Sequence, residues 1–188
     1  MARRLLTLPA IDSKSRVLLK FVLGILTALA STAQDKPSEA WWLRAVFLPS
    51  KTAYESLPAT DINPDWVKIS MLSYASLPSE AQADLGWMHR DGFHFQVDNY
   101  FKRTNLTDRE LCGVFEDRAG HKGRFLLVLE RPSKGPWKVS FLHQEVGEAG
   151  FSVLLSKPNG LFWSTCMQCG EFSRLRTKQS GFYLDQAP

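Results

Sequence analysis

Two cysteines three residues apart form the sharpest chemical motif in the chain. Cys166 and Cys169, followed by a glycine, fall between two strand-like runs, where a turn is expected. We expect these thiols to form a local disulfide, which an oxidising compartment would favour. A second interpretation is a zinc knuckle that uses both cysteines with Cys112 and His143 as further ligands. A redox pair is a third, although such pairs normally begin a helix and here a strand follows.

Basic side chains recur at every second position near the C-terminus. Arg174, Arg176 and Lys178 belong to a strand-like run, so an extended backbone would project all three from one face. A small surface patch for an anion or a partner is one interpretation of this spacing. We favour the alternative, a solvated sheet face.

Catalytic motifs are absent from the sequence. It contains no G-x-S-x-G elbow, no H-E-x-x-H helix and no phosphate-binding glycine loop. His89, Asp91 and His94, which lie close together in the sequence, and the pair Cys166 and Cys169 are the candidates for a non-local enzyme site. We therefore expect a non-enzymatic binding protein, with an envelope enzyme or a zinc-stabilised structural module as alternatives.

The first 33 residues have the pattern of a secretory signal. A basic segment ends at Lys20, the apolar run 21–30 follows, and small residues lead to a cleavage site after Ala33. The apolar stretch is too short to span a bilayer, which needs about 20 apolar residues. We expect export by the general secretory route to the periplasm or the extracellular space, with no stable membrane span after cleavage.

Removal of this signal changes the charge of the protein. The full chain of 188 residues has 23 basic and 19 acidic residues, and residues 1–33 hold five of the former and one of the latter. The remaining 18 of each sign make the mature chain formally neutral. This balance argues against a nucleic-acid partner, and we expect another envelope or extracellular protein instead.

Residues 34–188 are predicted to form a single β-rich domain. Short apolar or alternating runs follow one another from Gly92 onward, separated by turn residues such as Asn159-Gly160. Such short connections favour antiparallel pairing. We expect an α+β, mainly β fold, with a meander of about six to eight short strands after a small helical N-terminal part. The pattern leaves open whether the sheet stays open or curls toward a barrel.

Overall fold

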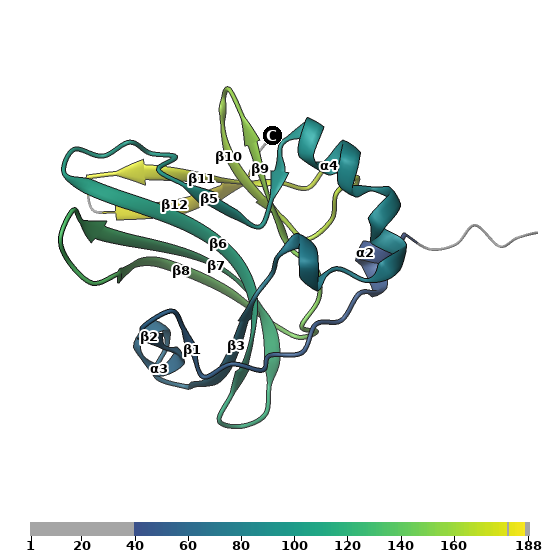
Figure 1. The fold of residues 1–188 in the computed structure, drawn as a ribbon, viewed down its shortest axis with the longest axis horizontal. Helices are drawn as coiled ribbons and strands as arrows, with labels where there is room; N and C mark the ends of the chain where they lie inside the picture. The colour runs from purple at the N-terminus through teal and green to yellow at the C-terminus, as the bar shows by residue number, and fades with distance from the viewer. Residues whose placement is uncertain (1–39, 180, 187–188) are drawn as a thin grey trace, which may run out of the picture. The chain divides into compact units, whose positions relative to one another are not determined.

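The computed structural model describes residues 40–179 and 181–186, which form mainly antiparallel β-structure (Figure 1). The expected fold class is therefore confirmed. The predicted signal, residues 1–33, lies outside the described residues. The helical segments all precede the long strands: α2 (Trp41–Arg44), α3 (Ala59–Ile62), the 3₁₀ turns η1 (Tyr74–Ser76) and η2 (Ser79–Ala83), and α4 (Leu85–Asp91).

Two five-stranded antiparallel sheets contain most of the strands. The first sheet has the order β3-β6-β7-β8, with β5 also paired to β6: β3 (Trp66–Met71), β5 (Gln96–Asp98), β6 (Leu106–Asp117), β7 (Lys122–Pro132) and β8 (Lys138–Val146). The second sheet has the order β12-β11-β10-β9-β4: β4 (Phe93–His94), β9 (Val153–Lys157), β10 (Gly160–Ser164), β11 (Ser173–Lys178) and β12 (Gly181–Gln186). A small hairpin, β1 (Ala53–Tyr54) and β2 (Leu57–Pro58), stands apart.

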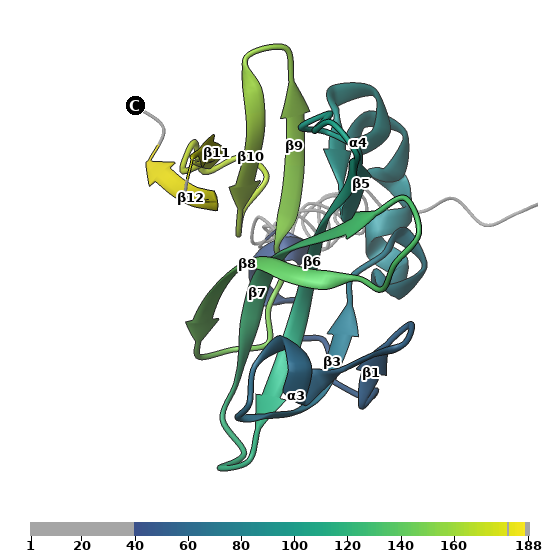
Figure 2. The same cartoon turned by 90° about the vertical axis from the view of Figure 1, so that its left-hand side faces the viewer.

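The central strand β7 is covered on both faces, as its uninterrupted apolar run predicts. Leu126 and Val128 pack with residues of the second sheet, such as Leu161 and Leu175. Alternate residues of β7, including Leu127, pack on the other face with residues of α3 and β3. Figures 1 and 2 show the corresponding layers, with α3 and β1 on the side of the first sheet away from β11 and β12. Buried side chains thus cover both faces of the first sheet, and one of the core clusters lies between the two sheets.

The two sheets are connected through a continuous segment at one side. The chain leaves β4 in the second sheet, passes through the buried residue Phe95, and enters β5 in the first sheet. The alternation of Phe93, Phe95 and Val97 predicts one strand, but the segment changes sheets at its middle residue. At the other side β8 and β12 are neighbours, although no pairing joins them within the described residues. The arrangement is therefore a two-sheet sandwich that approaches a barrel.

Pro78, the acidic Glu80 and the following Gly86 predict a short helix over residues 77–85, but the structure displaces the helix toward the C-terminus. Residues 79–83 form the 3₁₀ turn η2, and α4 begins at Leu85, so that Gly86 lies inside it. The Asp84 carboxylate explains this placement, because it accepts hydrogen bonds from Trp41 Nε1 at 2.7 Å and Trp87 Nε1 at 2.8 Å. Gly92, at a φ of 86°, ends the helix in the left-handed conformation that favours glycine.

Candidate anion-binding surface and the acids buried beside it

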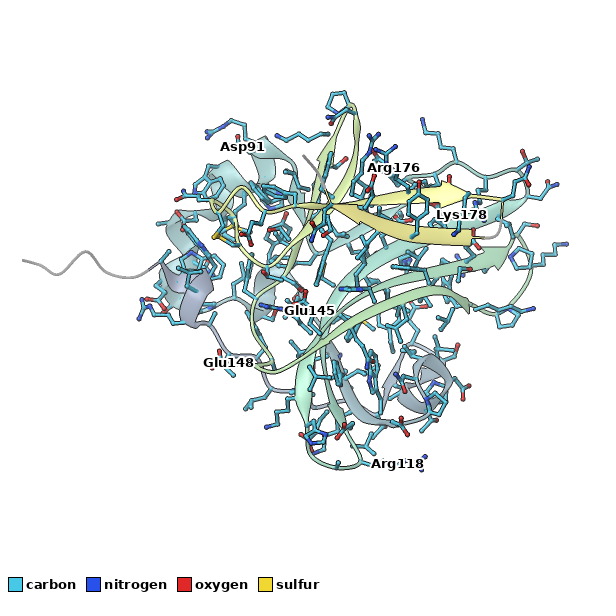
Figure 3. The ribbon with its side chains drawn as sticks, turned by 180° about the vertical axis from the view of Figure 1, so that it is seen from behind. Asp91, Arg118, Glu145, Glu148, Arg176 and Lys178 are labelled. Atoms are coloured by element: carbon cyan, nitrogen blue, oxygen red, sulfur yellow. A yellow bond between two sulfur atoms is a disulfide. The ribbon has the colours of Figure 1, made fainter. Side chains whose placement is uncertain are left out.

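Three basic side chains form a row on the outward face of β11. Arg174, Arg176 and Lys178 occupy alternate positions, whereas Leu175 between them points inward and is buried in the core between the sheets. Figure 3 labels Arg176 and Lys178, which lie along the β11–β12 hairpin. The structure therefore brings together the three residues that the alternation predicts, and we call them the cation row.

The cation row is only partly neutralised. Arg176 Nε lies 3.0 Å from Asp185 Oδ2 on β12. Arg174 instead donates to the Asn159 carbonyl and lies 5.9 Å above the Phe162 ring, and Lys178 Nζ is 5.4 Å from the Tyr183 ring. Neither Arg174 nor Lys178 forms an ion pair with a carboxylate of the described residues. The row therefore keeps a positive charge that a ligand could neutralise.

A cavity of about 370 Å³ opens beside the cation row. Gly160 contributes to its floor, and a Cβ at this position would lie 2.5 Å from Arg174 Nε, so the glycine makes room for the guanidinium. Tyrosine and phenylalanine rings supply much of the remaining lining: Tyr100, Phe101 and Tyr183. The cavity thus combines aromatic walls with two arginines.

One wall of the cavity belongs to the loop between β5 and β6, residues 99–105, which we call the closing loop. Asn99, Lys102 and Asn105 have φ values of 55°, 47° and 65°, so three non-glycine residues occupy the left-handed region. Asparagine tolerates this region, but for lysine it is uncommon. Such a backbone persists where the surrounding structure holds it in place.

Two acidic side chains of the first sheet bind the closing loop. The backbone N–H of Phe101 donates to Asp108 Oδ2 at 2.8 Å. Arg103 Nη1 contacts Glu130 Oε1 at 2.8 Å, and its guanidinium lies 4.6 Å above the Phe182 ring. The loop is therefore tied to β6 through one carboxylate and to β7 through another.

A third acid, Glu110, lies beside Asp108 on the inner face of β6. Both side chains are 0% exposed. Asp108 Oδ1 and both carboxyl oxygens of Glu110 have no hydrogen-bond partner within the described residues when the two groups are ionised. Burial first, and then the charge and hydrogen bonding of Asp108, together raise the pKa of Glu110 to about 9. At neutral pH Glu110 is therefore protonated.

This buried pair is not evident from the sequence. The apolar run 111–115 predicts a strand of that length and leaves Asp108 in the preceding loop, whereas β6 begins at Leu106. The available signal was the alternation of Asp108, Glu110 and Cys112, three residues that share one face once the strand is extended toward its N-terminus. Acidic side chains are rarely fully buried, so this pair on a core-facing strand surface is a candidate functional feature.

The two C-terminal cysteines form the expected disulfide. Cys166 and Cys169 are bonded, with 5.6 Å between their Cα atoms. The Ser164 hydroxyl supports the turn, because it donates to the Cys166 and Glu171 carbonyls and accepts from the Cys166 N–H. This turn also inserts Met167 into the core beneath α4.

The zinc alternative does not gather its ligands in the structure. Cys112 is fully buried between the sheets, where burial raises the pKa of its thiol far above the ordinary value. His143 instead packs its ring at 5.1 Å from Trp163, and Cys166 and Cys169 are bonded to each other. Among the described residues, no three His, Cys, Asp or Glu side chains lie together as a metal site would require.

The histidines considered for an enzyme site lie around the end of α4. His89 stacks on Tyr74 with 4.1 Å between ring centroids. Burial lowers the pKa of His94, and the nearby charge of His89 lowers it further. Asp91, labelled in Figure 3, turns its carboxylate to Arg90 at 3.2 Å. The two histidines are thus neighbours, but the carboxylate is engaged elsewhere.

A larger groove of about 760 Å³ follows the outer edge of β3, where Lys51 forms a bridge with Ile69. Val46 and Leu48, at 61% and 73% exposure, lie on its N-terminal side, and Met71 lies on β3. Its lining has no charge pattern comparable with that of the cation row. The groove shows an apolar surface without indicating what would cover it.

Comparison with known proteins provides no relative from which a function could be transferred. No protein-family model, no curated protein and no solved structure matches the chain. Within residues 40–179 and 181–186, no helix is long and apolar enough to cross a membrane. The functional interpretation therefore depends on the geometry of the sites.

Proposed function

We propose that this protein is a small, exported, non-enzymatic binding protein whose cation row holds an acidic segment of another envelope or extracellular protein. The observation that supports this proposal is the row of Arg174, Arg176 and Lys178 beside an aromatic-lined cavity. A neutralised row would argue against such a role, but Asp185 is the one carboxylate within ion-pair distance among the described residues.

The spacing of the row suits an extended acidic segment. Alternate residues on a strand are separated by roughly 6.6 Å, so the row presents charges at the same repeat as alternate side chains of an extended peptide. Arginine adds bidentate geometry toward carboxylates. Phe162 of β10 and Tyr183 of β12 flank the cations from the neighbouring strands. Carboxylates of the partner would therefore meet cations at a matching repeat, with Arg176 also paired with Asp185.

Export is a further part of the proposal. It is supported by the signal-like residues 1–33 and by the disulfide between Cys166 and Cys169, since such bonds persist in oxidising compartments. Intact mass spectrometry of the protein recovered outside the cytoplasm would detect cleavage after Ala33. Recovery of the uncleaved mass from the cytoplasm would contradict export.

A direct binding experiment can use a fluorescently labelled oligo-glutamate peptide as the acidic probe. The double variant Arg174→Glu with Lys178→Glu should lose at least tenfold in affinity, because two attractive contacts become repulsive. Lys134→Glu with Lys138→Glu is the matched control, since both lysines are exposed, belong to the β7–β8 hairpin and not to β11, and undergo the same charge change. Fluorescence anisotropy at low and high salt measures the affinity and its electrostatic part.

Two outcomes would refute the proposed site. The first is an equal loss of affinity in the row variant and the control variant, which would indicate a general effect of net charge. The second is no measurable binding of the probe by the unmodified protein at low salt. Binding that weakens with salt and disappears in the row variant alone would support it.

A further inference from the structure

We infer that Asp108 and Glu110 form a proton-operated latch that holds the closing loop, and with it the Tyr100–Phe101 wall of the cavity beside the cation row. This inference concerns the regulation of the proposed site, so its consequence for ligand binding rests on the proposed function. The latch itself is a property of the fold. It can be tested without any ligand.

The latch is built where the closing loop covers the end of the core between the sheets. Asp108 contacts the loop twice, because its carboxylate accepts from the Phe101 N–H at 2.8 Å and its carbonyl accepts from the Asn99 N–H at 2.9 Å. The Phe101 ring packs edge-on against Phe182 of β12 at 5.1 Å. Any movement of Asp108 would therefore be transmitted directly to the cavity wall.

Charged and titratable groups surround the pair from every neighbouring element. Asp98 of β5 adds negative charge, and it is itself paired with Arg109 at 2.6 Å on the other face of β6. Glu130 of β7 is paired with Arg103 of the closing loop and accepts a hydrogen bond from Ser140 of β8. Tyr100 of the closing loop and Arg174 of β11, which lies near Tyr100, complete the surroundings. Arg103 is already paired with Glu130, so no cation is assigned to Glu110 among the described residues.

A proton between Asp108 and Glu110 resolves this excess of negative charge. Protonated Glu110 can donate to Asp108, which leaves Asp108 Oδ2 free to accept from Phe101. Because the pKa of Glu110 is about 9, the proton is present at neutral pH and leaves in mildly alkaline solution. Ionised Glu110 would then place a second negative charge in a site with no solvent exposure.

Release of the closing loop is the easiest response to this second charge. Asn99, Lys102 and Asn105 of the loop are left-handed, whereas the flanking strands are held by continuous pairing. Movement of the loop would admit water to Glu110 and would displace Tyr100 and Phe101 from the cavity. We therefore expect proton loss to weaken the binding of acidic ligands.

Limited trypsin digestion tests the latch, because the exposed Lys102 lies within the closing loop. The readout is the rate of cleavage after Lys102 or Arg103 divided by the rate after Lys134, an exposed site in another loop that corrects for the pH dependence of trypsin. Because the pKa of Glu110 is about 9, the ionised fraction of its carboxyl group rises from about 1% at pH 7 to about 75% at pH 9.5. The rate ratio should rise at least tenfold over this range.

Two variants separate the latch from general loosening of the fold. Glu110→Gln keeps a hydrogen-bond donor toward Asp108 but has no proton to lose, so its ratio should stay within about twofold between pH 7 and 9.5. Asp108→Asn removes the neighbouring charge that raises the pKa of Glu110, so the rise should begin at lower pH. Urea denaturation at pH 7 verifies that each variant is folded.

The results distinguish failure of the latch from failure of the proposed function. A ratio that does not change with pH in the unmodified protein, or that rises equally in Glu110→Gln, would overturn the latch. Oligo-glutamate affinity should fall several-fold from pH 7 to 9.5 in the unmodified protein and less in Glu110→Gln. Absence of oligo-glutamate binding at pH 7 would refute the proposed function, while the proteolysis ratio would still decide the latch.

Discussion

Replacement of Glu110 by glutamine should make the protein more stable at neutral pH. In the native structure the pKa of Glu110 rises from 4.5 to about 9 because the side chain is buried beside Asp108. Between these two values the native state holds a proton that the unfolded state has lost. Since the native state binds more protons in this window, this group makes stability fall as the pH rises from about 4.5 to 9.

The expected change in the free energy of unfolding follows from the width of the pH range between the two pKa values. Each pH unit is worth about 1.36 kcal/mol for one proton, so the free energy of unfolding should fall by about 4 kcal/mol between pH 5 and 8 through Glu110 alone. Glutamine does not titrate, and Glu110→Gln should lack this contribution. At pH 7 the free energy of unfolding of the variant should exceed that of the unmodified protein by up to about 3 kcal/mol. This difference is reduced by about 1 kcal/mol if the second amide hydrogen of the glutamine finds no acceptor.

Urea denaturation at pH 5, 6, 7 and 8, followed by tryptophan fluorescence without reductant, measures this difference. The gap between Glu110→Gln and the unmodified protein should widen steadily with pH, at equal m-values. Glu148→Gln is the matched control, because Glu148 is exposed on the loop after β8, as its label in Figure 3 indicates. Parallel pH profiles of the unmodified protein and Glu110→Gln would refute the assignment of a proton to the buried pair.

Two further predictions concern the core and the cysteines. Leu127→Ala should lower the free energy of unfolding by about 3 kcal/mol, because Leu127 is fully buried in the central strand. Leu43→Ala, at an exposed position, should change it by less than about 1 kcal/mol. Equal losses in the two variants would contradict the burial of β7 between two layers. Thiol titration should detect no reactive thiol in the native protein, one (Cys112) after unfolding, and three after unfolding and reduction, because Cys166 and Cys169 are bonded and Cys112 is buried. A second thiol in the unfolded, unreduced protein would contradict the disulfide.

Local features of the fold were predictable where a short stretch of chain carries the information. The apolar run around Leu127 indicates a strand covered on both sides, and β7 has this environment. The disulfide between Cys166 and Cys169 is equally local, because a two-residue interval keeps both thiols in one turn. The alternation of Arg174 and Arg176 predicts a shared face for the same reason.

Boundaries and changes of direction were less predictable. The helix expected over residues 77–85 became a 3₁₀ turn followed by α4, since Asp84 binds two tryptophan side chains, one of them 43 residues away. The run from Phe93 to Val97 divides between two sheets, although its alternation is that of one strand. In both cases distant contacts outweigh the local pattern.

The sequence by itself determined the β-rich class, the position of the disulfide and the common face of the cation row, because side-chain direction along a strand alternates with a local period of two. Tertiary structure alone decided which charges are neutralised and which are buried. Asp185 reaches Arg176 because β12 folds back on β11. Asp108 and Glu110 become a buried acidic pair because the second sheet and the closing loop cover that face of β6, and burial is a property of the assembled fold.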